Sequence, residues 1–132
     1  MEFADVRACL EKDGWPIEVL SDVTIRSFFR GGERIFPLFI HRESEYMTFA
    51  VIPFLKLPKD DEDVHAVLGR LLRLNRDMNM AKFSIDEDDD VVLSVEYRLA
   101  DLDPSEVRDA VDVLSFYAEK YRAELLSLAG PS

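Results

Sequence analysis

The chain has 132 residues, of which 48% are hydrophobic and nine are phenylalanine, so it can form a packed core and is not intrinsically disordered. Its 27 acidic and 16 basic residues give a formal net charge of −11, and the basic residues are scattered along the chain. Such a surface disfavours binding to nucleic acid and to anionic membranes.

The sequence also predicts where the protein resides. The N-terminal stretch lacks the basic and long apolar regions of a signal peptide, and no segment approaches the roughly 20 apolar residues of a membrane span. The single cysteine, Cys9, cannot form an intrachain disulfide, and its apolar neighbours indicate a core or boundary residue and not a nucleophile. We therefore expect a cytoplasmic protein with one domain over residues 1–132.

The N-terminal half is predicted to hold one helix and three strands. Apolar residues recur at helical spacing over Glu2–Lys12, and Gly14 and Pro16 then stop the helix. Strands follow over residues 23–30, 33–42 and 45–57, where β-branched and aromatic residues dominate. Two-residue turns at Gly31-Gly32 and Glu43-Ser44 would join them into an antiparallel meander.

The C-terminal half is predicted to hold two helices and a hairpin. The first helix starts at Asp60 or Asp61, and the hairpin strands span residues 81–86 and 91–99. Asp103 caps the last helix, with Pro104 at its first position. The spacing of that helix's apolar stripe would also suit a short coiled coil, but docking on the sheet is favoured. The resulting order, α-β-β-β-α-β-β-α, predicts an α+β fold with an antiparallel sheet packed by helices.

Side-chain alternation sorts the residues of the three-stranded meander onto two faces of the sheet. With two-residue turns, Phe29 pairs with Arg34 and Ile40 with Met47. The inner face, which we expect the helices to cover, collects Ile25, Phe29, Phe36, Leu38, Ile40, Met47, Phe49 and Val51. The opposite face, called here the mixed face, collects Thr24, Arg26, Phe28, Ile35, Pro37, Phe39, His41, Tyr46, Thr48, Ala50 and Ile52.

The mixed face is more apolar than a solvated sheet face, which suggests a contact surface. Its predicted partner-binding residues are apolar anchors with a polar rim, namely Arg26, Phe28, Ile35, Phe39, His41, Tyr46 and Ile52. Alternatively, the helices divide between both faces and bury these residues. Pro37 and Pro53 each predict a bulge or a free edge, because a proline cannot donate to a strand ladder.

Five consecutive acids, Asp86–Asp90, stand between the strands of the C-terminal hairpin. Asp86, Asp88 and Asp90 match the first ligand positions of an EF-hand loop. The sixth position is Val91 instead of glycine, and the twelfth is Tyr97 instead of glutamate. We therefore interpret the segment as a solvated hairpin tip, with no metal site predicted and weak Ca²⁺ binding left open.

No sequence motif for catalysis or cofactor binding is present. The chain lacks phosphate-binding, dinucleotide-binding and nucleophile-elbow motifs. His41 and His65, its two histidines, lack a metal-ligand spacing, so an enzyme would require both to converge with carboxylates in the fold. We expect no enzymatic activity and no cofactor.

The chain nevertheless resembles a known bacterial family. Leu71–Tyr121 combines a helix ending in LNR, the hairpin KFSIDEDDDVVLSVEY and the terminal helix DPSEVRDAVDVL, and the earlier stretches EKDGWP and FLKLP fit the same pattern. These motifs are similar to the YbjN-like domain, which resembles the type III secretion chaperones in fold. The resemblance implies a small, acidic, homodimeric protein that acts as a regulator or holds extended segments of partner proteins, and it transfers no catalytic residue.

The resulting hypothesis is a non-enzymatic, homodimeric interaction module that binds a protein segment through the mixed face. Strand addition at a free sheet edge would be a second mode of binding. The alternative is a homodimeric structural or regulatory domain without a client, in which the mixed face is the dimer seam.

Overall fold

A computed structural model describes residues 1–130. Helix α1 (Phe3–Lys12) leads into a two-residue strand, β1 (Glu18–Val19), and then into the meander of β2 (Thr24–Gly31), β3 (Arg34–Glu43) and β4 (Tyr46–Lys56). After the meander come helix α2 (Asp61–Asp77) and the hairpin of β5 (Lys82–Ile85) and β6 (Asp90–Arg98). They are followed by a 3₁₀ turn (Leu99–Asp101) and helix α3 (Pro104–Ala129). The predicted α+β fold and its element order are confirmed, and only β1 and the 3₁₀ turn were not predicted.

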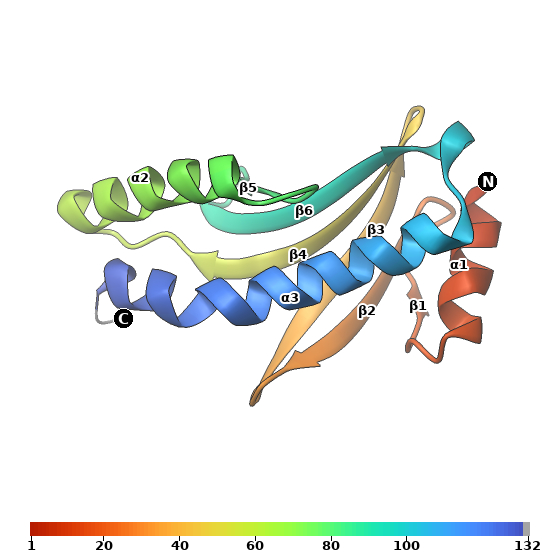
Figure 1. The fold of residues 1–132 in the computed structure, drawn as a ribbon, viewed down its shortest axis with the longest axis horizontal. Coiled ribbons are helices and arrows are strands. Elements are labelled where there is room, and N and C mark those ends of the chain that lie inside the picture. Colours follow the sequence, from red (N-terminus) through yellow and green to blue (C-terminus); the bar gives the residue numbers. More distant parts are fainter. Residues whose placement is uncertain (131–132) are drawn as a thin grey trace.

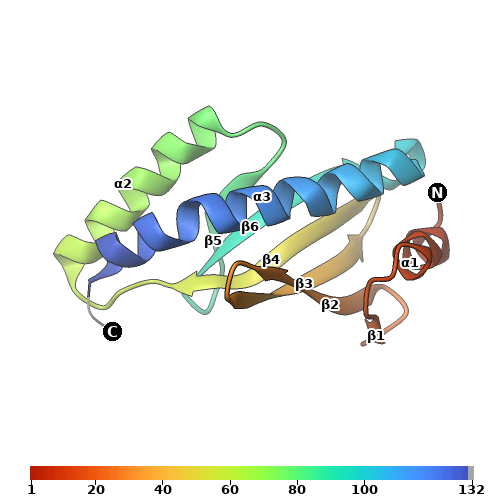
Figure 2. The same cartoon turned by 60° about the horizontal axis from the view of Figure 1, so that its bottom comes forward.

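The six strands form one antiparallel sheet in the order β1-β2-β3-β4-β6-β5. Figures 1 and 2 show α2 and α3 on the same side of this sheet, with α1 beside β1 and β2 at one end. The possibility that the helices divide between both faces is therefore wrong. No helix within residues 1–130 is long and apolar enough to cross a membrane.

The inner face forms the core, as the alternation predicts. All eight of its predicted residues are buried, with side chains no more than 7% exposed. Aromatic rings run through this core from one end of the sheet to α3, each centroid within 6.5 Å of the next, in the order Trp15, Phe29, Phe36, Phe54, Phe83 and Tyr121. The stripe of α3 docks on the inner face as predicted, and Val107, Leu114 and Leu125 are fully buried there.

Both predicted hairpin registers are wrong by two residues, although the faces are right. Phe29 pairs with Phe36 and Ile40 with Phe49, because the turns fall at 32–33 and 44–45. Each turn places a residue with positive φ first, Gly32 at 62° or Ser44 at 55°. A two-residue slip conserves the period of alternation, so every side chain keeps its predicted face.

The helix termini follow from local sequence. Asp103 caps α3 by accepting hydrogen bonds from the backbone N–H groups of Ser105 and Glu106, and the Glu106 side chain accepts from the Asp103 N–H in return. Asp60 is the first residue before α2, and three acids in the first turn favour the positive end of the helix. Within the described residues, only α3 has a side-chain cap of these two helices, because the Asp60 side chain makes no capping hydrogen bond.

Candidate functional site

The mixed face is left uncovered by the helices. Phe28, Ile35 and Tyr46 are 51%, 53% and 43% exposed, although large apolar side chains are usually buried. Pro37, Phe39, His41 and Ile52 are half-buried by their neighbours on the same face, and Ala50 is buried. Exposed apolar groups gathered on one sheet face are typical of a contact surface.

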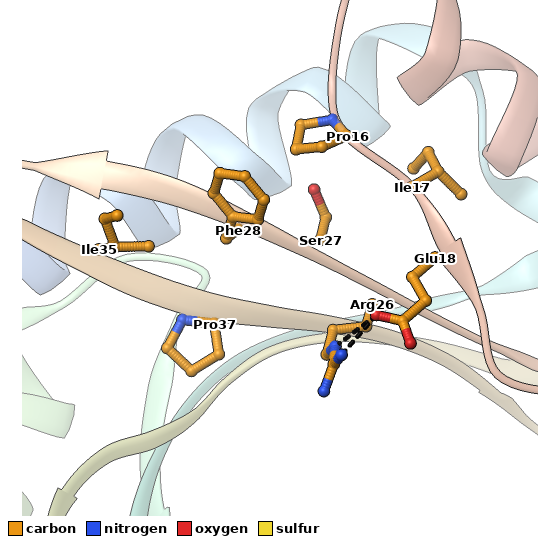
Figure 3. Close-up of a pocket in the computed structure, with 8 residues that line it drawn as sticks. All are labelled: Pro16, Ile17, Glu18, Arg26, Ser27, Phe28, Ile35 and Pro37. Atoms are coloured by element: carbon orange, nitrogen blue, oxygen red, sulfur yellow. Dashed lines mark hydrogen bonds and ion pairs between the residues drawn. The ribbon is translucent and has the colours of Figure 1, made fainter.

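The most hollowed part of the mixed face lies around Phe28. Phe28 pairs with Pro37 across the β2–β3 ladder, and with Ile35 these side chains line a groove of about 480 Å³. Pro16 and Ile17 form the opposite wall of this groove (Figure 3). We call it the Phe28 groove. An apolar groove of this size accommodates one or two side chains of a bound segment.

The wall of the Phe28 groove comes from a segment that sequence reasoning passed over. After α1, Gly14 takes a φ of 87° and turns the chain toward the sheet, and Trp15 packs edge-on against Phe29 at a centroid distance of 6.4 Å. That packing positions Pro16 and Ile17 beside Phe28. An apolar Trp-Pro-Ile run directly after a helix stop is the signal that would have indicated this contact.

The edge of β2 is open beside the Phe28 groove. Strand β1 pairs only with Ile25 and Arg26, so residues 27–31 have no strand on that side among the residues described. Ser27 belongs to this edge and lines the groove (Figure 3), and its buried hydroxyl oxygen has no hydrogen-bond partner within residues 1–130. The unpaired backbone N–H and C=O groups of this edge can form hydrogen bonds with an added strand.

The opposite edge of the sheet is closed. Asn75 of α2 donates to the Phe83 carbonyl at 3.0 Å and accepts from the Phe83 N–H at 2.6 Å, which satisfies the backbone at the middle of β5.

Strand β3 has a free stretch within the sheet. Its pairing with β4 stops at Leu38–Val51, and β4 has a bulge between Val51 and Leu55. The predictions drawn from Pro37 and Pro53 are therefore confirmed.

The predicted polar rim residues are both engaged within the fold. Arg26 is ion-paired with Glu18 of β1, which neutralises its charge and holds β1 against β2. His41 lies 2.6 Å from the Thr24 hydroxyl through Nδ1. Both side chains border the mixed face and use part of their polar groups within the fold, whereas Phe28, Ile35 and Tyr46 expose large apolar groups there.

The seven predicted residues share the mixed face but do not form one compact site. Phe28 and Ile35 lie near the β2–β3 turn, whereas Tyr46 lies at the other end of β4 beside Arg98 of β6. Phe39 lies between them, opposite Arg26 and Ala50. A segment that touched all of these residues would have to lie extended, since six strand residues separate Tyr46 from Ile52, about 20 Å.

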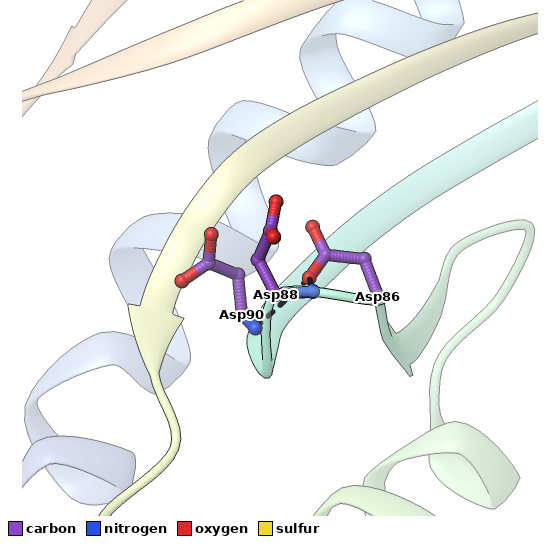
Figure 4. Close-up of side chains that lie close together, drawn as sticks. All are labelled: Asp86, Asp88 and Asp90. Atoms are coloured by element: carbon purple, nitrogen blue, oxygen red, sulfur yellow. Dashed lines mark hydrogen bonds between the residues drawn. The ribbon is translucent and has the colours of Figure 1, made fainter.

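The acidic tip is less solvated than predicted. Asp86 Oδ1 accepts from the N–H groups of Asp88 and Asp90 at 3.0 Å each (Figure 4). Asp90 is buried and accepts from Lys56 Nζ at 3.0 Å. One ligand atom from each of Asp86, Asp88 and Asp90 lies within 4.8 Å of the others. The Asp86 carboxylate holds the turn closed, and the Asp90 carboxylate connects β6 to Lys56 of β4. The prediction that the whole tip is solvated is wrong for Asp90, because its side chain turns toward Lys56.

The histidines do not meet carboxylates in a cluster. His65 is exposed on α2, His41 bonds to Thr24, and the acidic tip is the one converging group of potential metal ligands found within residues 1–130. Cys9 is half-buried, and burial followed by the charge of Asp13 raises the pKa of its thiol. An activated cysteine nucleophile has a lowered thiol pKa, so the raised pKa of Cys9 does not indicate a nucleophile.

Comparison with known proteins assigns the family. The sequence profile of the YbjN family, described as "Putative bacterial sensory transduction regulator", matches residues 3–127. The chain belongs to the YbjN family. The family resemblance predicted from sequence is thereby confirmed. No match was found among curated proteins.

Solved structures share the fold of this YbjN-family chain. The structure of YbjN from E. coli, "a putative transcription regulator", matches with a TM-score of 0.67 at 14% identity over 94% of this chain and 93% of that one. The heterodimeric ExoU–SpcU complex from the type III secretion system of Pseudomonas aeruginosa contains a chain that matches with a TM-score of 0.62 at 22% identity, over 95% and 98%. The Yersinia pestis type III secretion chaperone SycH, in complex with a fragment of YscM2, gives 0.59 at 13% identity, over 89% and 97%. These likenesses confirm the predicted chaperone-like fold.

Proposed function

We propose that this YbjN-family protein is a non-enzymatic, chaperone- or regulator-like interaction module of the cytoplasm. Residues 1–132 act as one domain, which binds an extended segment of another protein along the mixed face. The protein needs no cofactor and binds neither nucleic acid nor membrane. It works as a homodimer that leaves this face free.

The observation that carries the proposal is the exposed apolar surface of the mixed face. Phe28, Ile35 and Tyr46 together expose large apolar groups on the face opposite the buried core residues of their strands. Helices α2 and α3 lie on the other side of the sheet (Figure 2). Burying such groups against a partner is favourable by about 25 cal/mol for each Å² removed from water. The acidic surface elsewhere on the chain keeps the protein soluble and repels anionic partners.

Two further features favour an extended protein segment as the ligand. The open β2 edge borders the Phe28 groove, so a segment can pair its backbone with residues 27–31 while its side chains enter the groove. The solved neighbours with the same fold include SycH and a chain of the ExoU–SpcU complex, both determined with protein partners.

The experiment is site-specific photo-crosslinking in native lysate. A crosslinking residue is placed at Phe39, in the middle of the mixed face, and the products are identified by mass spectrometry. A matched control carries it at Leu72, which is 71% exposed on α2, on the helix side of the sheet. We expect one or more partner proteins to be captured from Phe39 and not from Leu72.

A pair of substitutions shows whether the captured partner binds the proposed surface. Phe39→Glu and Tyr46→Glu each place a charge on the mixed face, and we expect both to abolish capture and co-purification of the partner while circular dichroism shows a folded chain. Unchanged capture and unchanged self-association in both variants would refute the proposal.

The second candidate is a homodimeric regulatory domain without a client, with the mixed face as its seam. The same exposed residues favour it, because a second copy could cover them. Crosslinks from Phe39 only to the same chain, together with a dimer in light scattering that Tyr46→Glu dissociates, would support this candidate over segment binding.

A further inference from the structure

A second groove lies on the helix side of the β2–β3 turn, separate from the Phe28 groove. It has a volume of about 620 Å³, and it runs between the turn residues 31–34 and the C-terminal part of α3. Gly31 brings the backbones close there, since a Cβ on this residue would lie 3.8 Å from Cβ of Glu119. We call it the arginine groove, because Arg34 and Arg122 both line it.

Arg122 has a hydrogen-bond donor that the fold leaves unsatisfied. Its side chain is half-buried, and its Nε is buried without a hydrogen-bond partner in the described part of the chain. Five other arginines of the protein form ion pairs with carboxylates. A buried guanidinium donor without an acceptor is unusual in a protein with this excess of acid.

Arg34 adds a second positive charge to the same groove. Its guanidinium carbon lies 6.0 Å from the centroid of the Phe36 ring. Burial, and next the charge of Arg34, lower the pKa of Arg122. Two neighbouring guanidinium groups repel each other, and an anion placed between them relieves that repulsion.

The carboxylates near the arginine groove do not fill this role. Glu33 and Glu119 line the groove, yet no ion pair joins either of them to Arg34 or Arg122 among residues 1–130. Their carboxylates lower the net positive charge of the groove. Planar guanidinium groups match the two oxygens of a carboxylate well.

We propose that the arginine groove binds a carboxylate of the partner segment, an acidic side chain or a C-terminus, between Arg34 and Arg122. This inference rests on the proposed function, because the carboxylate belongs to the protein segment that is proposed to bind the mixed face. Continuity between the grooves supports it, because Ile35 lines both the Phe28 groove and the arginine groove. A segment held on the mixed face can therefore pass the β2–β3 turn and place an acid beside the arginines.

The first test measures the anion site alone, by NMR of the arginine Nε–H groups during titration with acetate. Acetate is the carboxylate probe, inorganic phosphate the comparison anion, and chloride the salt control. We expect a saturable shift of Arg122 Nε–H with acetate, and no such shift of Arg73, which is exposed on α2. A shift that is linear, or equal to that of Arg73, would overturn the proposal, and so would tighter binding of phosphate than of acetate.

Substitutions at Arg34, Arg122 and Glu119 assign the site to its residues. Arg34→Gln and Arg122→Gln each remove one charged donor, and we expect each to weaken acetate binding roughly tenfold or more. Glu119→Gln removes a repelling charge and should tighten binding. If Arg122→Gln unfolds the protein, Arg122→Lys keeps the charge without the Nε donor and should still weaken binding. Unchanged affinity in the folded arginine variants would refute the assignment.

The second test asks whether the carboxylate comes from a protein segment. Peptides that bind the protein are selected from a random peptide library. We expect peptides selected on the wild-type protein to contain an acidic residue or a free C-terminus beside apolar residues, and those selected on Arg34→Gln to lose this preference. Equal acid content in both selections would overturn the partner-segment carboxylate. If Phe39→Glu abolishes peptide binding but leaves the acetate shift unchanged, the proposed function and the anion site are both supported as separate properties. A wild-type protein that selects no peptide contradicts the proposed function, and the acetate titration still decides the anion site.

Discussion

The inner face and the mixed face are built from the same three strands and contain similar residues, yet they differ in environment. Phe49 and Phe28 are both phenylalanines in the middle of a strand, but Phe49 is fully buried and Phe28 is 51% exposed. The difference comes from α2 and α3, which lie on one side of the sheet only. An apolar residue thus serves stability or binding according to whether the chain itself supplies a cover.

The largest expected effect is on stability at the inner face. Phe49→Ala removes a fully buried ring and leaves a cavity, so we expect it to lower the free energy of unfolding by about 3–5 kcal/mol. Total stabilities of such domains are only about 5–15 kcal/mol. Urea unfolding followed by circular dichroism measures the change as a shift of the midpoint.

The matched control is Phe28→Ala on the mixed face. Because half of this ring is already in water, we expect it to cost about 1 kcal/mol or less, while it weakens partner capture. If Phe28→Ala and Phe49→Ala lower the free energy of unfolding equally, the two faces do not differ as described. That result would show that the mixed face is buried in the folded protein.

A smaller effect is expected where the inner face meets the β2–β3 turn. A Cβ on Gly31 would lie 2.8 Å from Cε2 of Phe36, whose ring is stacked between Phe29 and Phe54 at 5.3 and 5.9 Å. The ring cannot move aside freely, so Gly31→Ala should cost about 1–3 kcal/mol. Gly32 has open space but a φ of 62°, and Gly32→Ala should cost about 1 kcal/mol through backbone strain.

A double-mutant cycle separates these two causes. Phe36→Leu provides room for the new methyl group, so it should recover part of the cost of Gly31→Ala and none of the cost of Gly32→Ala. The measurement is again the free energy of unfolding in urea. Full additivity of Gly31→Ala and Phe36→Leu would show that contact with the ring is not the cause.

Short-range rules predicted most of the fold. The two faces of the sheet were predicted correctly although both hairpin registers were wrong. A register error of an even number of residues leaves every side chain on its predicted face. The cap at Asp103 and the stop at Gly14 follow from residues adjacent in sequence. Apolar character alone does not identify the buried face of a helix, since Leu72 of α2 is 71% exposed.

The candidate site depended on contacts that no local pattern contains. Pro16 and Ile17 line the Phe28 groove only because Trp15 docks on Phe29. Arg34 and Arg122 are 88 positions apart in sequence and meet because α3 crosses the end of the β2–β3 hairpin. These contacts form only when the helix and the loop dock on the sheet. The sequence therefore predicted the mixed face, but it did not predict the Phe28 groove or the arginine groove.

The smallest expected effect concerns the cap of α3, the helix that covers the inner face. Hydrogen bonds from the Ser105 hydroxyl and from the backbone N–H groups of Glu106 and Ser105 lower the pKa of Asp103 from its ordinary 3.8. A lowered pKa in the folded state contributes stability above pH 3.8, and this contribution is lost as the pH falls through the lowered value. Asparagine caps helices equally well without a charge.

Asp103→Asn should therefore keep most of the stability at pH 7 and show a shallower loss of stability between pH 5 and pH 3 than the wild-type protein. Urea unfolding at several pH values measures this slope. Asp112→Asn is the control, because Asp112 is exposed on α3 and its carboxylate makes no hydrogen bond among the residues described. If Asp103→Asn and Asp112→Asn change the slope equally, the effect comes from net charge; if only Asp103→Asn does, the acid stability of the inner face depends on the cap of the helix that covers it.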